Sequence, residues 1–197
     1  MLLVYFVLAS LAVGLLRRRR RGLGQVNSIP LAAPWLPIAA FLLEAAIGPL
    51  SGWVGPTTAL WLTVPAQYLL LGVFLLLNRR LSSSIPLALG TVCNLLVIGT
   101  NGWRMPVSSR IFDLPHLTAA AERIASGELA EYVVAGPQTR LLWLGDVIHF
   151  SWVPGMAFAS IGDFLLGIGI FWMIQQLMVP KEVPEAASFP EHSSNIV

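Results

Sequence analysis

Long apolar runs recur along this chain and constrain its fold more than any other feature. They lie at about residues 1–16, 33–50, 58–77, 85–100 and 156–179. A helix that crosses a bilayer needs roughly 20 mostly apolar residues, with a range of about 17–25. Only 11% of the chain is charged, against about 25% in soluble domains. The sequence therefore predicts an all-α integral membrane protein with five transmembrane helices in a single domain, residues 1–179.

Positive charge is distributed unevenly between the predicted helices. Arg17 to Arg21 follow the first run, Arg79 and Arg80 follow the third, and Lys181 follows the fifth. Cytoplasmic loops carry the excess of Lys and Arg in membrane proteins. Five crossings therefore place the N-terminus outside and the C-terminus in the cytoplasm. Residues 180–197 contain three prolines together with serines and acids, a composition that predicts a disordered cytoplasmic tail.

The longest connection, residues 101–155, joins the fourth and fifth predicted helices on the outer side. Within it, Asp113 is expected to cap a helix over 117–125 that Gly127 ends. Residues 139–153 mix leucines and aromatic residues with polar ones and predict an interfacial or re-entrant segment, because tryptophans favour the headgroup level. The outer segment is therefore expected to be helical or re-entrant.

Smaller signals place the turns and bends. Residues 51–56 are rich in Gly and Pro and predict a turn between the second and third helices. Pro65 predicts a kink in the third helix. Asn101-Gly102 is expected to end the fourth helix, with a left-handed residue after its last turn.

Three polar residues interrupt the apolar runs: Glu44, Asn94 and Asp163. A charge at the bilayer centre costs at least ~2.5 kcal/mol, so each group needs a partner or water. Small residues lie one helical turn from each of them, a spacing typical of closely packed helices. Counted from the outer helix ends, all three lie at a depth of ~9–11 Å. We therefore expect one polar cluster in the outer half of the bundle, roofed by residues 101–155, with Arg104 as the nearest cation.

Several interpretations of this cluster stay open. It can be structural, with polar groups that hold helices together. It can instead be a site for a small polar ligand, an ion or a proton, using Glu44 and Asp163. A metal site would need Asp146 and His149 with His116 or Asp163. Asp146 and His149 are also the one acid and base pair that suggests enzyme chemistry.

Four motifs in order give the chain a family resemblance. They are Asn94-Leu-Leu-Val-Ile-Gly-Thr-Asn101-Gly-Trp-Arg-Met-Pro106, Thr139-Arg-Leu, Leu144-Gly-Asp-Val-Ile148 and Ser160-Ile-Gly-Asp163. With these motifs the chain resembles the bacterial membrane-protein family known as domain of unknown function 5317, from the second predicted helix onward. Trp103 stands where the family pattern has a second glycine, and His149 where it has a proline.

The resemblance implies a bacterial plasma membrane and no assigned activity. It also implies that six residues occupy signature positions: Asn94, Asn101, Gly102, Pro106, Asp146 and Asp163. With Glu44 and Arg104 these six form the predicted binding or structural polar cluster.

Three functional hypotheses are compatible with these features of the sequence. The first is a non-enzymatic membrane component or accessory subunit that contacts the lipid bilayer and a membrane-protein partner or a second copy of the chain. The second is a small transporter, channel or ligand-binding protein. The third is a membrane enzyme. No cofactor, metal or nucleic acid is expected, because the chain has no phosphate-binding glycine loop, no cysteine pair and no nucleophile elbow.

Overall fold

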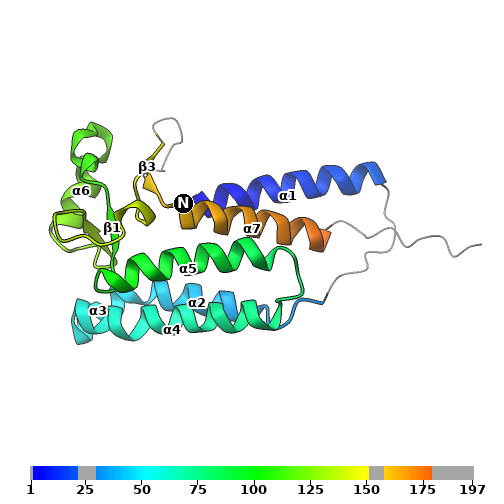
Figure 1. Ribbon diagram of the computed structural model, residues 1–197, viewed down its shortest axis with the longest axis horizontal. Coiled ribbons are helices and arrows are strands. Elements are labelled where there is room, and N and C mark those ends of the chain that lie inside the picture. The colour runs from blue at the N-terminus through cyan, green and yellow to red at the C-terminus, as the bar shows by residue number, and fades with distance from the viewer. Residues whose placement is uncertain (1, 22–29, 151–157, 179–197) are drawn as a thin grey trace, which may run out of the picture.

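Five helices lie side by side in the computed structural model, which describes residues 2–21, 30–150 and 158–178 (Figure 1). They are α1 (Leu2–Arg21), α2 (Trp35–Ala45), α4 (Pro56–Leu77), α5 (Ser84–Thr100) and α7 (Ile161–Met178). A shorter helix, α3 (Ile47–Val54), follows α2. The predicted helices at 58–77 and 85–100 match α4 and α5 to within two residues. The predicted tail, 180–197, lies outside the described residues.

Length and hydropathy distinguish the five helices. α4 and α7 are each long and apolar enough to cross a membrane, and the bent pair α2–α3 would be a third crossing if it counts as one span. The apolar part of α1 (Leu2–Arg17) and α5 are shorter apolar helices. The fold is therefore mostly helical with two to three candidate membrane spans, and these criteria do not establish all five predicted crossings.

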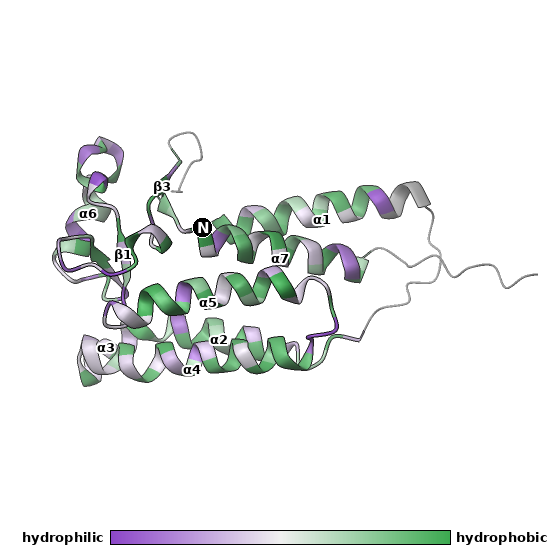
Figure 2. Ribbon diagram, in the orientation of Figure 1, coloured by the Kyte–Doolittle hydropathy of each residue, from purple (hydrophilic) through white to green (hydrophobic). Residues whose placement is uncertain are grey.

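The polar parts of the molecule lie at its two ends. Figure 2 shows mostly apolar helices, with hydrophilic residues gathered around α6 at one end and in the segment between α4 and α5 at the other. That second segment contains Arg79 and Arg80, and Arg17 lies near the same end of α1. The described basic residues after the first and third predicted helices therefore share one end of the bundle.

The helices pack in an order that differs from their order in the chain. α7 packs against both α1 and α5, α5 also contacts α4, and α4 contacts α2 and α3. Glycines on α7 allow these close approaches. A Cβ on Gly90 of α5 would lie 2.6 Å from the carbonyl oxygen of Gly162. Gly167 faces Phe6 of α1, where an added Cβ would meet its ring.

A bend of 48° separates α2 from α3. Pro49 accounts for it, because proline offers no N–H to the carbonyl of Ala45 and its ring clashes with that carbonyl. Gly48, next to it, further weakens the helix. The predicted turn at 51–56 is too long, since α3 continues to Val54 and the chain turns at Gly55, whose φ is +83°. α4 continues as one helix past Pro65.

Polar side chains join the helices at the end opposite α6. The amide of Asn78 donates to the carbonyl of Ala32 at 2.9 Å and accepts from the N–H of Ala32 at 2.9 Å. Between α1 and α7, the Gln175 amide donates to the Ser10 carbonyl at 2.6 Å. These bonds fix the start of α2 and the α1–α7 pair.

The cap, residues 105–149, covers the other end of the bundle. Its strand β1 (Met105–Val107) pairs in parallel with β2 (Tyr132–Val134), and β3 (Ile148–His149) pairs antiparallel with β4 (Phe158–Ala159). Its helical segments are η1 (Ser109–Asp113), η2 (Pro115–Leu117), α6 (Thr118–Ala125) and η3 (Leu142–Leu144). The expected helix before Gly127 is confirmed as α6. The expected N-terminal residue of that helix is wrong, because Asp113 lies in η1 and Leu117 precedes α6 without a side-chain bond.

Candidate functional site: a cavity beneath the cap

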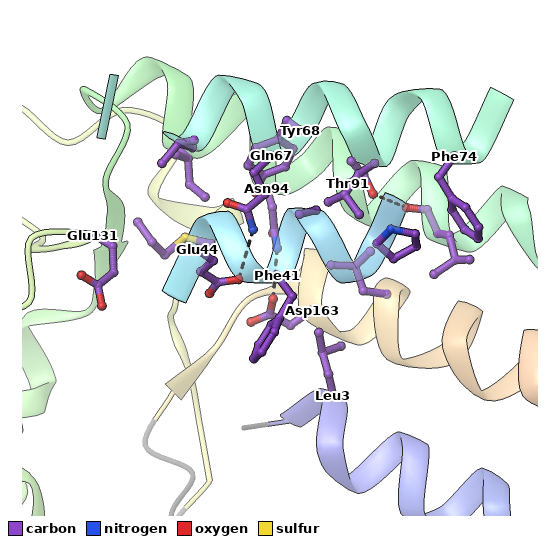
Figure 3. Close-up of a pocket in the computed structure, with 18 of the residues that line it drawn as sticks. Leu3, Phe41, Glu44, Gln67, Tyr68, Phe74, Thr91, Asn94, Glu131 and Asp163 are labelled. Carbon is purple, nitrogen blue, oxygen red and sulfur yellow. Dashed lines mark hydrogen bonds between the residues drawn. The ribbon is translucent and has the colours of Figure 1, made fainter. Parts of the chain in front are cut away.

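A cavity of about 430 Å³ lies between α2, α4, α5, α7 and the cap (Figure 3). The part nearest the cap is lined by polar and aromatic side chains, and the rest is lined mainly by Leu, Ile, Phe and Met. The polar and aromatic lining residues near the cap are Glu44, Gln67, Tyr68, Asn94, Trp103, Glu131, Tyr132, Asp146 and Asp163. Four of these carry carboxyl groups, and no Lys, Arg or His is found among the described lining residues.

The cavity brings together half of the predicted site. Glu44, Asn94, Asp146 and Asp163 all line it, as the equal depth of the three helical residues predicts. The other four predicted residues do not line it. Asn101, Gly102 and Pro106 belong to the framework that positions the cap, and Arg104 lies elsewhere.

Asn94 and Asp163 are held in a network at the start of α7. Ser160 and Asp163 form a reciprocal capping box: the Asp163 N–H donates to Ser160 Oγ at 3.0 Å, and the Ser160 N–H donates to Asp163 Oδ2 at 3.2 Å. Asn94 Nδ2 donates to Asp163 Oδ1 at 3.0 Å, and Ser160 Oγ donates to Asn94 Oδ1 at 3.0 Å. Both oxygens of Asp163 and both polar atoms of Asn94 therefore have partners.

Glu44 lies in the last turn of α2, just before the bend. Gln67 of α4 donates from Nε2 to Glu44 Oε2 at 3.1 Å (Figure 3). The side chain of Glu44 is otherwise exposed to the cavity. The C-terminal end of a helix carries partial negative charge, so this end of α2 favours a cation near Glu44.

Asp146 is fixed by its main chain, but its side chain lacks a partner. Its N–H donates to the Pro106 carbonyl and its carbonyl accepts from the Ser108 N–H, each at 2.9 Å. Gly145 makes this approach possible, since a Cβ there would lie 2.6 Å from the Pro106 oxygen. Asp146 is 9% exposed, and its Oδ1 has no hydrogen-bond partner within the described part of the chain.

The electrostatics of the cap follow from this burial. Burial, assisted by the negative charge of Asp163, raises the pKa of Asp146 to about 7, although the positive N-terminus acts in the opposite direction. Burial also raises the pKa of the neighbouring Tyr132 phenol, and the charge of Asp146 adds to this effect. Near neutral pH, the Asp146 carboxyl is therefore divided between its protonated and ionised forms.

The C-terminal end of α5 is formed by Asn101, Gly102 and Trp103. Gly102 has a φ of +69°, and the Trp103 N–H donates to the Ile98 carbonyl at 2.9 Å, as in a Schellman motif. The expected left-handed residue is thus confirmed. Trp103 also has a positive φ, +64°, a conformation that glycine adopts without strain, so a second glycine would suit this position.

The Asn101 side chain joins the end of α5 to the far end of the cap. Its Oδ1 accepts from the Arg140 N–H at 3.0 Å, and its Nδ2 donates to the Arg140 carbonyl at 2.8 Å. Nδ2 also donates to the Val97 carbonyl at 2.7 Å. Asn101 therefore closes residues 102–139 into a loop with tethered ends.

The structure does not place Arg104 with the acids. Arg104 lines a separate hollow in the cap with Phe112 and Ile124. Within the described ranges it makes no ion pair within 4.0 Å with Glu44, Asp146 or Asp163. Its two neighbours in the chain, Trp103 and Met105, line the cavity, whereas Arg104 lines the separate hollow.

His149 does not join Asp146 in the cavity. Its ring lies 5.2 Å from that of Phe158 and 6.2 Å from that of His116, measured between centroids. The spacing of Asp146 and His149 would put both on one face of a helix, but His149 lies in β3. No three His, Cys, Asp or Glu side chains group as metal ligands in the described residues.

Several residues of the site are not predicted by the sequence. The spacing of Ser160 and Asp163 is that of a capping box and was a usable signal. Glu131 and Tyr132 reach the cavity only because the cap folds over the bundle, and Trp103 because of the turn after α5; no local pattern indicates either contact.

Comparison with known proteins supports the resemblance. The sequence pattern of a family described as a family of unknown function (DUF5317) matches residues 28–175, which is 148 of 197 residues. A search of curated proteins and a search of solved structures each returned no match. The match includes all five residues from α2, α4, α5 and α7 that line the polar end of the cavity. The chain therefore belongs to the family of unknown function DUF5317.

Proposed function

We propose that this chain is a multi-pass protein of the bacterial plasma membrane that binds a small positively charged ligand in the cavity beneath the cap. The proposed topology has five crossings, with the N-terminus and the cap outside and the C-terminus in the cytoplasm. Two to three candidate spans and two further apolar helices support it. Arg17, Arg79 and Arg80, at the end opposite the cap, support the orientation.

The observation that supports this proposal best is the concentration of carboxyl groups in the cavity. Four carboxyl groups line it with no Lys, Arg or His among its described lining residues. The buried Asp146 Oδ1 also has no hydrogen-bond partner among them. A buried unpaired charge is unfavourable, and a bound cation would supply the missing partner.

The structural interpretation explains only part of the cluster. Asn94 and Asp163 are saturated by each other and by Ser160, as expected of residues that hold helices together. Glu44 and Asp146 are left with unpaired oxygens. We therefore assign Asn94 and Asp163 to packing, and Glu44 and Asp146 to the ligand. An enzyme that pairs Asp146 with His149 is not favoured by their separate surroundings.

The test is a thermal melt of the purified protein in dodecyl maltoside at pH 8. Tetramethylammonium chloride is added at up to 100 mM and compared with sodium chloride at equal ionic strength. We expect only tetramethylammonium to raise the Tm, since a tenfold excess over Kd stabilises a protein by about 1.4 kcal/mol. The rise should be lost in Glu44→Gln combined with Asp146→Asn.

Glu128→Gln is the matched control. Glu128 is an exposed carboxylate of the cap that pairs with Arg123 at 2.8 Å, outside the cavity. This variant should respond to tetramethylammonium as the wild type does. Equal Tm values in both salts for the wild type would overturn the proposal and return the accessory-subunit hypothesis to first place.

A further inference from the structure

The cavity extends well beyond its acidic end. Along α7 it is lined from Asp163 to Met173, ten residues that correspond to ~15 Å of helix. On α4 it is lined by Leu71, Phe74 and Leu75. The site is therefore elongated, with charge at the cap end and an apolar remainder that a small hydrophilic cation would leave empty.

Aromatic rings accompany the carboxylates at the acidic end. Tyr132 lines it from the cap, Trp103 from the turn after α5, and Tyr68 from α4. Cations, and quaternary ammonium groups in particular, are attracted to the faces of such rings. The combination of rings and acids favours an alkylammonium head over a metal ion, for which the described residues show no grouped ligands.

The cavity opens sideways, at the level of the helices. Phe41 lines it and is 66% exposed, and Glu44 nearby is exposed as well. Figure 3 shows Phe41 on the side of α2 that faces Leu3 of α1. α2 is held by α3 and α4, whereas α1 is held by α7. The two helices beside the opening, α1 and α2, are therefore held by different neighbours.

We infer that the cavity takes a single-chain amphiphile with an alkylammonium head, which enters from the lipid between α1 and α2. This inference rests on the proposed function, because the head occupies the same acidic end. The tail lies along α4 and α7. A volume of about 430 Å³ is near the lower end of the roughly 300–1,000 Å³ of small-molecule sites, which suits one chain. The carboxylates disfavour anionic heads.

The experiment measures Kd for tetramethylammonium and for hexyl-, octyl- and decyltrimethylammonium by titration calorimetry in dodecyl maltoside. Alkyl sulfates of the same lengths are the charge control. In the wild type, each added methylene should tighten binding by up to about fourfold, and the sulfates should not bind.

Two tryptophan substitutions on α4 distinguish binding in the cavity from partition of the amphiphile into detergent micelles. Leu71→Trp fills the apolar part of the cavity, whereas Leu69→Trp adds the same ring at a residue that is 67% exposed and lies outside the lining. Partition into micelles affects both variants equally. We expect the chain-length gain to survive in Leu69→Trp and to disappear in Leu71→Trp. Ile170→Trp fills the same part from α7 and replaces Leu71→Trp if that variant does not fold.

The outcomes distinguish the two proposals. If tetramethylammonium binds but longer chains bind no tighter, or gain equally in Leu71→Trp and Leu69→Trp, the amphiphile inference is wrong and the cation site stands. If no ammonium ion of any length binds, both are wrong. If alkyl sulfates bind as well as alkylammonium ions, the head assignment is wrong.

Discussion

Polar side chains of the same types lie in two regions of the bundle, the contact between α5 and α7 and the cavity between α2 and α7. The two regions differ in how many of these polar atoms have hydrogen-bond partners. At the α5–α7 contact, Asn94 and Asp163 have partners on every polar side-chain atom. In the cavity, Asp146 Oδ1 has none among the described residues, and Glu44 has a partner on one oxygen. The glycines differ as well, since Gly162 is tightly enclosed whereas a Cβ added to Gly48 of α3 would meet no atom within 4 Å.

Polar residues inside apolar helices can therefore be distinguished by their partners. The residue type does not decide between a structural and a ligand role, because a carboxylate serves each region. What decides is whether the protein itself satisfies the group. The same substitution should therefore have opposite effects on stability in the two regions.

The largest effect should come from closing the α5–α7 contact with one methyl group. In Gly162→Ala, the new Cβ would collide with Asn94 Oδ1 and lie 3.0 Å from the Gly90 carbonyl. Overpacking costs about 1–3 kcal/mol, and displaced Asn94 bonds add about 1 kcal/mol each, so we expect a loss of about 4 kcal/mol. Thermal melts in detergent measure it. Gly72→Ala, with no atom within 4 Å, should be neutral or stabilising; equal losses in both would refute the close contact.

Removing the amide at this contact should cost somewhat less. Asn94→Ala leaves Asp163 Oδ1 and Ser160 Oγ without their partner. We expect a loss of about 3 kcal/mol in the free energy of unfolding, because a bond to a charged group is worth about 1.5–3 kcal/mol. Thr100→Ala, on the same helix but exposed, is the control and should stay within about 0.5 kcal/mol. A loss as small as that of Thr100→Ala would contradict the network.

Neutralising Asp146 in the cap should raise the free energy of unfolding, in contrast to the two substitutions above. The pKa of Asp146 is about 7 in the folded protein, above the ordinary 3.8. The contribution of this carboxyl to stability is therefore fully present below pH 3.8 and is lost as the pH rises to about 7. Asp146→Asn removes this dependence. Relative to wild type, the variant should therefore gain on the order of 2–3 kcal/mol between pH 5 and pH 8. Melts of both proteins across this range test it, and a constant difference would show that Asp146 ionises normally.

The smallest effect on stability is expected at the mouth of the cavity. Glu44 is exposed and its one bond is to Gln67, so Glu44→Gln should change the free energy of unfolding by less than about 1 kcal/mol. The same substitution should weaken tetramethylammonium binding. A loss of Tm as large as that of Asn94→Ala, with tetramethylammonium binding unchanged, would show that Glu44 has a structural role like that of Asn94.

Depth and spacing predict the helical part of the site well. Helical rise alone places Glu44, Asn94 and Asp163 at one level, and all three line one cavity. Rise along a helix is nearly constant, so the depth of a residue follows from its position in its own helix. Which residues pair is not local: Gln67 reaches Glu44 because α4 packs on α2, and Asn94 reaches Asp163 because α5 packs on α7.

Two differences from the expectations have physical causes that the sequence only partly reveals. A kink is expected at Pro65, where α4 is continuous, whereas the break between two helices falls at Pro49. Both prolines remove a helical hydrogen bond, yet Pro49 follows Gly48 whereas Pro65 lies between Val64 and Ala66, which resist bending better. Arg104 is expected near the acids because it lies only a few residues past the fourth helix, but the turn after α5 places it in a separate hollow.

The two hydrogen bonds from Asn101 to Arg140 allow the exposed turn between them to vary in length. Because this one side chain pins both ends of residues 102–139, changes in the length of that segment need not be transmitted to α5. Loop-closure entropy adds only about 0.6 kcal/mol for each doubling of length. The exposed turn at Pro137 and Gln138 is therefore a place where evolution or an engineer can graft a tag or a recognition element while the helices below keep their register.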